Sequence, residues 1–301
     1  MLPRHIGRHL TARSKTVSLV LGIGGARGLA HIGVIQWLSE NGYDIRSIAG
    51  SSMGALIGGI YAAGRLPVYT EWVLALERMQ VLRLLDPAFG RSGLFKGARI
   101  IGVLRGLIGE FEIEDLPVLF TAVATDLESG DEVWLRKGKL FDAIRASIAT
   151  PLVFTPFEHG GRELFDGGLV NPVPIGPTLN DTTDLTVAVS LSGPIEPSPP
   201  PVPRAPIPEG NNYRQRIRAF TESLHHATPP AAPARGMFDI AFASMEAMQG
   251  TIAHLRLAAF SPDVMIEMPR NACGLFEFWR AAEMIALGRE RTARAFAAAE
   301  R

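Results

Sequence analysis

Residues 16–64 read TVSLVLGIGGARGLAHIGVIQWLSENGYDIRSIAGSSMGALIGGIYAAG, and this stretch decides the fold. The β-branched, apolar run Thr16–Gly22 stops at a glycine, which predicts a buried strand. The helix predicted next ends at Asn41-Gly42, and IRSIAG is a second short strand. A helix rich in small residues then runs from Met53 to Gly64. Strand, helix, strand and helix in this order indicate an α/β sheet with parallel pairing.

The remaining sequence continues this alternation and predicts one domain. We expect helices over 70–85, 98–108, 139–149, 237–258 and 276–299. We expect strands over 117–127, 132–136, 184–191 and 263–269, and a hairpin whose tip is Gly160-Gly161. The domain would run from 16 to 301 after an N-terminal extension, 1–15.

Two proline-rich connectors, at about 193–210 and 227–236, interrupt the predicted domain. The helical segment 212–226 between them is amphipathic. It is either a flap that touches lipid or covers a pocket, or a helix packed on the core.

Composition excludes several classes of protein. Thirty basic residues balance thirty acidic ones among 301 residues, so no net charge attracts nucleic acid or anionic membranes. A single cysteine, Cys273, rules out an intrachain disulfide and a multi-cysteine metal site. The apolar run before Arg27 is too short and too rich in glycine for a signal peptide or a membrane span. We expect a cytoplasmic protein, with peripheral contact to a membrane and no nucleic-acid partner.

The first glycine-rich loop is LGIGGARG, Leu21–Gly28, between a predicted strand and a predicted helix. Glycines there allow a sharp turn and leave amides free to face an anion. A dinucleotide site, as in an oxidoreductase, needs G-x-G-x-x-G. Gly22 and Gly24 fit that pattern, but Arg27 occupies the third position, and Asp44 precedes the second strand instead of ending it. The nucleotide-binding alternative is therefore disfavoured.

The second glycine site is GSSMG, Gly50–Gly54, which has the form G-x-S-x-G between a strand and a helix. This is the context of a nucleophile elbow, in which a strained turn exposes the serine hydroxyl. The helix N-terminus and the Met53 amide would favour negative charge beside Ser52. A tight packing turn is the alternative interpretation.

A serine nucleophile needs a base. One histidine before the elbow and four after it are poorly placed for this role, because they lie inside predicted helices, at a hairpin tip or at the edge of a connector. They are His31, His159, His225, His226 and His254. Asp166, in the run Asp166-Gly167-Gly168 after a short strand, is better placed. Its alternative interpretation is an Asx turn, which Asp-Gly forms readily.

Three segments in order, GIGGARGLAHIGV, GSSMG and DGGLVNPVPI, resemble the patatin-like phospholipases. The similarity is greatest to the short bacterial members of the neuropathy-target-esterase type. SGLFKGARI, AVATDLESGDEVW, IRASIATPLVFTP and the C-terminal segments PDVMIEMP and GLFEFWRAAEMIALGR extend it over roughly residues 15–192 and 237–295. This resemblance implies a three-layer α/β/α fold with a mostly parallel central sheet. It also implies a serine lipid acyl hydrolase of the esterase, phospholipase A or lysophospholipase type.

The resemblance further implies a Ser-Asp dyad without histidine, with Ser52 as nucleophile and Asp166 as proton acceptor. The amides of Gly24, Gly25 and Ala26 would form the oxyanion hole. Arg27 would hold the glycine loop or neutralise charge near it. Supporting glycines are Gly28, Gly50, Gly54, Gly167 and Gly168.

The implied substrate is a fatty acyl ester or phospholipid, with no cofactor. The sequence contains no D-x-D-x-D-G loop of the kind that binds calcium, so we expect the activity to need no metal ion. Because a carboxylate is a weak base for serine near neutral pH, we predict a secluded Asp166 in contact with Ser52. Two alternatives remain: a catalytically silent regulator or scaffold of the same fold, and an acyltransferase.

Overall fold

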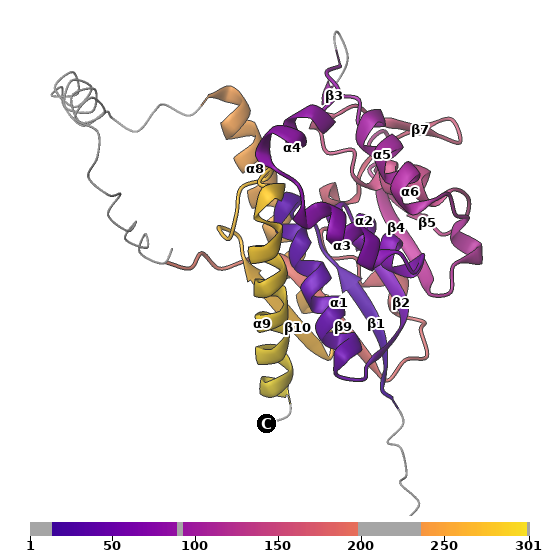
Figure 1. The fold of residues 1–301 in the computed structure, drawn as a ribbon, viewed down its shortest axis with the longest axis vertical. Coiled ribbons are helices and arrows are strands. Elements are labelled where there is room, and N and C mark those ends of the chain that lie inside the picture. Colours follow the sequence, from indigo (N-terminus) through magenta and orange to yellow (C-terminus); the bar gives the residue numbers. More distant parts are fainter. Residues whose placement is uncertain (1–13, 89–92, 198–235, 300–301) are drawn as a thin grey trace, which may run out of the picture.

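A mostly parallel sheet forms the centre of the structure, a computed structural model that describes residues 14–88, 93–197 and 236–299 (Figure 1). The strand order is β10-β9-β1-β2-β4-β8-β7, with β5 also paired to β4. The five strands from β10 to β4 are mutually parallel, whereas β5, β7 and β8 join in antiparallel pairs. The bounds are β1 Thr16–Leu21, β2 Asp44–Ser51, β4 Leu119–Asp126, β5 Glu132–Leu135, β7 Phe157–His159, β8 Arg162–Asp166, β9 Leu185–Gly193 and β10 Val264–Pro269.

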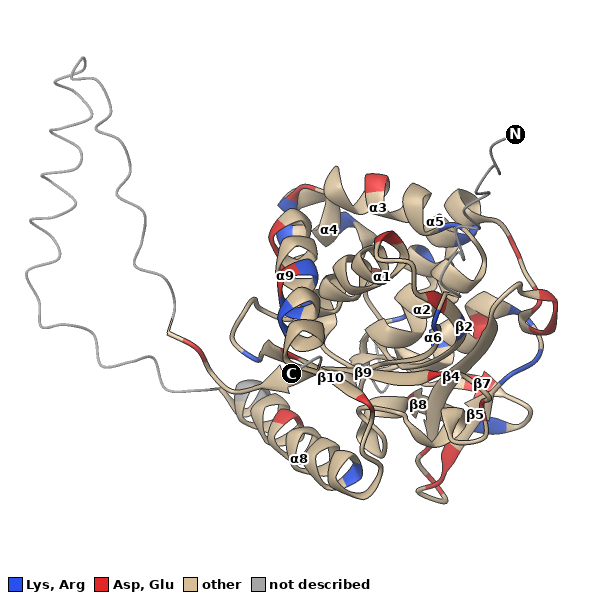
Figure 2. Cartoon of the chain, turned by 90° about the horizontal axis from the view of Figure 1, so that it is seen from below, with Lys and Arg blue, Asp and Glu red and all other residues tan. Residues whose placement is uncertain are grey.

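Helices cover both faces of this sheet, which confirms the predicted α/β fold with a mostly parallel sheet. Figure 2 shows α8 (Met237–Ala259) on one face and α1 (Ala30–Glu40), α2 (Met53–Ala62) and α9 (Ala281–Ala299) on the other. The larger apolar core lies under α1, α2 and α9. A smaller one places Ala253 of α8 against Val20 and Ala188 of the sheet. Because both faces are covered, the central strands are almost entirely apolar and buried.

The predicted helix 70–85 is two helices, α3 (Leu66–Leu74) and α4 (Arg78–Leu84). The Glu77 side chain accepts from the backbone of Gln80, and the Gln80 side chain accepts from the Glu77 N–H. This capping box satisfies free donors and starts a new helix at Arg78. Other helices agree with expectation: α5 is Ala98–Ile108 and α6 is Leu140–Ser147.

Three further segments differ from the predicted elements. The last helix begins at Ala281 instead of 276, after a 3-10 turn (η5) at Phe278–Arg280. Two strands of three residues, β3 (Gly93–Phe95) and β6 (Leu152–Phe154), form a separate parallel pair. Such short strands leave no periodicity in the sequence.

The C-terminal helix α9 is held tightly against α1. A Cβ on Gly33 of α1 would lie 2.0 Å from the Ile285 carbonyl oxygen, and one on Gly288 of α9 would lie 2.0 Å from that of Ala30. Glycine therefore permits the two backbones to touch. The end of the chain thus packs beside the helix that follows the first glycine loop.

The N-terminal extension up to residue 13, the segment 212–226 and most of both proline-rich connectors lie outside the described residues. Their predicted roles stay predictions. Strand β9 extends to Gly193, so the first connector begins after that residue. Within the described ranges, no helix is both long enough and apolar enough to cross a bilayer.

Candidate active site

Strand β4 brings the ends of two distant segments together. On one side, Ser51 at the end of β2 pairs with Val123. On the other side, Asp166 at the end of β8 pairs with Ala124. Adjacent positions on one strand therefore place residues 52 and 166 at the same edge of the sheet, although 114 positions separate them in the chain.

Ser52 adopts the strained conformation of a nucleophile elbow. Its φ is 54° and its ψ is −121°, a region that costs a non-glycine residue about 1–3 kcal/mol. It is the N-cap of α2, and its side chain is not the capping group. The turn is tight, because a Cβ on Gly54 would lie 2.0 Å from the Leu21 carbonyl oxygen. The amide of Ser52 donates to the Ser147 hydroxyl at 3.0 Å, which fixes the strained residue.

Asp166 is almost completely buried, with 3% of its surface exposed. Thr150 Oγ1 donates to Oδ2 at 2.7 Å, and the Gly168 amide donates to Oδ1 at 2.8 Å. The Ser52 side chain is a further hydrogen-bond donor to this carboxylate. Burial raises the pKa of Asp166 above its ordinary value, and the bonds from Thr150, Ser52 and Gly168 oppose that rise. The structure thus brings Ser52 and Asp166 together in a secluded place.

The first glycine loop follows β1, the strand beside β2. Among the described residues, neither the Gly24 nor the Gly25 amide has an acceptor, so both are free to bind an anion. The Ala26 amide donates to the Leu275 carbonyl at 2.9 Å. This corrects the expectation for Ala26, because its only N–H is already engaged. Two amides are therefore available here instead of three.

Arg27 holds the glycine loop in place. Its guanidinium donates to the carbonyls of Gly24 and Arg270 and pairs with Glu246 of α8 at 2.8 Å. These contacts favour the structural role considered for Arg27 over neutralisation of a ligand. Each of the five supporting glycines also packs where a Cβ would meet a neighbour closer than 3.0 Å: Gly28, Gly50, Gly54, Gly167 and Gly168.

The described histidines do not contact Ser52. His31 is buried in α1, and its Nε2 lies 2.8 Å from the Gly22 carbonyl oxygen. Burial lowers the pKa of His31 to about 4, so the ring is neutral. His159 stacks on Phe157, and His254 bonds to the Gly250 carbonyl within α8. His225 and His226 lie outside the described residues.

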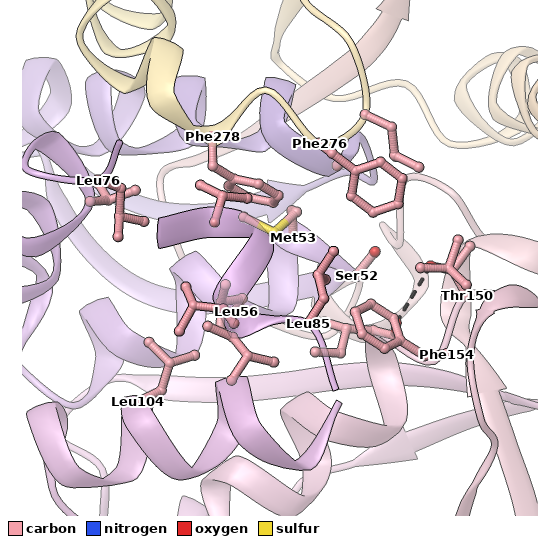
Figure 3. Close-up of a pocket in the computed structure, with 18 of the residues that line it drawn as sticks. Ser52, Met53, Leu56, Leu76, Leu85, Leu104, Thr150, Phe154, Phe276 and Phe278 are labelled. Atoms are coloured by element: carbon pink, nitrogen blue, oxygen red, sulfur yellow. Dashed lines mark hydrogen bonds between the residues drawn. The ribbon is translucent and has the colours of Figure 1, made fainter. Parts of the chain in front are cut away.

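An apolar pocket opens beside Ser52 and encloses a cavity of about 130 Å³. In Figure 3, Ser52 and Thr150 lie at one end, and Leu76 and Leu104 lie at the other. None of the lining side chains carries a formal charge. The wall comes from α2, α3, α4, α5, the segment after α6 and residues 275–278. Such a space suits a hydrocarbon chain whose reactive end reaches Ser52.

The model of the patatin-like phospholipase family matches residues 19–179, which include both Ser52 and Asp166. The chain belongs to the patatin-like phospholipase family. Membership places it in a family of lipid hydrolases. This patatin-like chain is 39% identical over 334 residues to uncharacterized NTE family proteins of Mycobacterium tuberculosis (strain ATCC 25618 / H37Rv) and Mycobacterium bovis (strain ATCC BAA-935 / AF2122/97). Those alignments cover 95% of this chain and 93% of each relative.

More distant matches cover a smaller share of the other protein. Neuropathy target esterase sws of Drosophila virilis is 32% identical over 176 residues, which cover 56% of this chain and 12% of that protein. Among solved structures, VipD from Legionella pneumophila is similar with a TM-score of 0.46 and 14% identity. That match covers 95% of this chain and 67% of VipD.

Two groups of residues at the site were not singled out by the sequence analysis. Ser147 and Thr150 bond to Ser52 and Asp166, but their segment had been interpreted only as the end of an amphipathic helix. Leu275, Phe276 and Phe278 line the pocket from the far end of the chain. The segment IRASIATPLVFTP, which supports the family resemblance, contains Ser147 and Thr150 and could have indicated the first group. The second group lies in GLFEFWR, a segment that supports the family resemblance but has no predicted place beside the glycine loop.

Proposed function

We propose that this protein hydrolyses carboxylic esters of fatty acyl chains with Ser52 as nucleophile and Asp166 as proton acceptor. One observation carries the proposal: a strained serine and a buried carboxylate flank β4, and the serine lies on the wall of an uncharged apolar pocket. A tight packing turn alone explains the strain at Ser52, but it does not explain the carboxylate beside it. Family membership supports the same chemistry.

The reaction proceeds in two steps. Ser52 Oγ attacks the ester carbonyl carbon, and its proton moves to Asp166. The amides of Gly24 and Gly25 bind the oxygen that becomes negative, and removal of such a donor costs about 3–4 kcal/mol of transition-state stabilisation in a known protease. The C–O bond breaks as Asp166 returns the proton to the leaving alcohol. Water, deprotonated by Asp166, then attacks the acyl-serine ester. The bond between Ser52 Oγ and the acyl carbon breaks as Asp166 gives that proton to Oγ, which releases the fatty acid and restores the serine.

The pocket favours a single acyl chain over a charged group. Met53, Leu56 and Leu104 are buried apolar side chains on its wall, and it has no cation to hold a phosphate. We therefore assign the acyl chain to the pocket and leave the headgroup or alcohol outside it.

Contact with a lipid surface would use the outer side of α3 and α4. Leu74, Met79 and Leu82 are each at least half exposed, whereas Val73 and Val81 of the same two helices line the pocket. These helices thus separate the acyl site from solvent and present apolar side chains outward. Contact here would let a lipid chain pass from a membrane toward Ser52 without crossing water.

The test uses purified protein with fatty acyl p-nitrophenyl esters and phospholipids. Ser52→Ala and Asp166→Asn should each abolish hydrolysis and prevent labelling by a fluorophosphonate. Ser190→Ala and Asp126→Asn are matched controls, because both side chains are buried in the same sheet and neither lines the pocket. Full activity of Ser52→Ala would refute the proposal. If the protein is labelled by the fluorophosphonate but transfers the acyl group to an added alcohol and releases no fatty acid, it is an acyltransferase instead.

A further inference from the structure

The segment Ser147–Thr150, at the end of α6, contacts both members of the proposed dyad. We propose that the hydroxyls of Ser147 and Thr150 are positioning groups that hold Ser52 and Asp166 in register for proton transfer. This inference rests on the proposed function. It adds that a single turn of chain, absent from both glycine motifs, sets the geometry of the dyad.

Ser147 fixes the nucleophile through its backbone. The side chain is completely buried, and its hydroxyl donates to the Val123 carbonyl at 2.5 Å while it accepts from the Ser52 amide at 3.0 Å. Val123 belongs to β4, the strand between β2 and β8. Ser147 therefore ties the strained elbow to β4, the strand with which Asp166 of β8 pairs, and no other described side chain bonds to the Ser52 amide.

Thr150 fixes the base through its side chain. Its hydroxyl donates to Asp166 Oδ2 at 2.7 Å, and the neighbouring Ala149 carbonyl accepts the Asp166 amide at 3.1 Å. Consecutive residues thus hold both the backbone and the carboxylate of Asp166. A donor to a carboxylate favours its charged form, so the Thr150 hydroxyl opposes the effect of burial on the pKa of Asp166.

The turn that carries these hydroxyls is rigid. The Thr150 amide donates to the Ile148 carbonyl at 2.7 Å, and the Thr150 carbonyl accepts the Phe154 amide at 2.9 Å. Pro151 prevents α6 from continuing. Ile148 and Thr150 also line the pocket, so the same turn forms part of the acyl site. The two hydroxyls and part of the pocket wall thus belong to one hydrogen-bonded turn.

The first experiment measures kcat/KM for a soluble acyl ester against pH. Thr150→Val should lower kcat/KM at neutral pH by about tenfold and move the acid limb to higher pH, because Asp166 loses a donor. Thr150→Ser keeps the donor and should restore the wild-type limb. Thr178→Val is the matched control, because the buried Thr178 hydroxyl donates to the Ile175 carbonyl and the residue neither lines the pocket nor bonds to Ser52 or Asp166.

The second experiment separates kcat from KM. Ser147→Ala should lower kcat and the rate of fluorophosphonate labelling by about tenfold with KM unchanged, because Ser147 does not line the pocket. Ser147→Cys, which keeps the volume but accepts weakly, should give the same fall if the alanine variant does not fold. Ser18→Ala, another fully buried serine that is hydrogen-bonded outside the site, is the control.

An acid limb in Thr150→Val that matches wild type would overturn the role of Thr150. A kcat in both Ser147 variants equal to that of Ser18→Ala would overturn the role of Ser147. If either of these results is obtained while the Ser52→Ala variant is inactive, only the positioning role is refuted. Hydrolysis that survives Ser52→Ala refutes the proposed function itself, so the two failures are distinguishable.

Discussion

Protonation of His31 should make this protein less stable in acid. The imidazole is fully buried, and Nε2–H donates to the Gly22 carbonyl, while Nδ1 has no partner among the described residues. Burial lowers the pKa of His31 from its ordinary value of 6.5 to about 4. Between these values the unfolded chain binds a proton that the folded chain does not, so the free energy of unfolding falls as the pH falls. At about 1.36 kcal/mol per pH unit, the loss is about 3 kcal/mol.

The measurement is urea unfolding of the wild type and His31→Gln from neutral pH down to about pH 4. Glutamine keeps a donor for Gly22 and does not titrate, so the difference between the two free energies should change by about 3 kcal/mol over this range. His254→Gln, at an exposed position of α8, should leave the difference flat. A pH-independent difference for His31→Gln refutes the reasoning. So does an NMR titration in which His31 protonates near its ordinary pKa.

Three further outcomes are expected. Asp166→Asn should be inactive yet have a higher free energy of unfolding at pH 7, measured by urea titration. The raised pKa of Asp166 means that the folded state loses stability as the pH rises and the buried carboxyl becomes charged, and asparagine removes that charge. A variant with a lower free energy of unfolding would contradict this. Leu104→Ala should lower the free energy of unfolding by about 2–5 kcal/mol and shift the preference toward longer acyl chains on a panel of p-nitrophenyl esters. An unchanged preference would mean that the acyl chain binds outside this pocket. Met79→Ser with Leu82→Ser should lower the ratio of vesicle-borne to soluble ester hydrolysis relative to Leu119→Ser, which removes an exposed leucine at the start of β4, the end opposite the site. An unchanged ratio would exclude contact through α4.

The first half of the fold could be predicted because its signals are local. The apolar run of β1, the small-residue helix α2 and the glycines between them each dictate a conformation within a few residues. Ser52 and Asp166 were predicted because the elbow and the Asp-Gly-Gly turn have recognisable sequences. The break between α3 and α4 was also encoded locally, in the reciprocal caps of Glu77 and Gln80, but the apolar pattern across it was continuous.

Other features depend on contacts between distant segments. Ser147 and Thr150 are ordinary residues at a helix end until β4 and β8 are placed beside them. Ala26 illustrates the converse: its amide belongs to a glycine loop that suits an anion, yet the carbonyl of Leu275 occupies it. The short strands β3 and β6 need each other as partners and have no pattern of their own.

The loop at 275–278 reaches the pocket from beyond the region that the family model matches, 19–179. The pocket is therefore lined both from within the matched region, which holds Ser52 and Asp166, and from a segment about a hundred residues beyond it. Substitutions in this loop would change the shape of the pocket while leaving Ser52 and Asp166 unchanged. Grafting such loops between relatives is a direct route to redesigning selectivity.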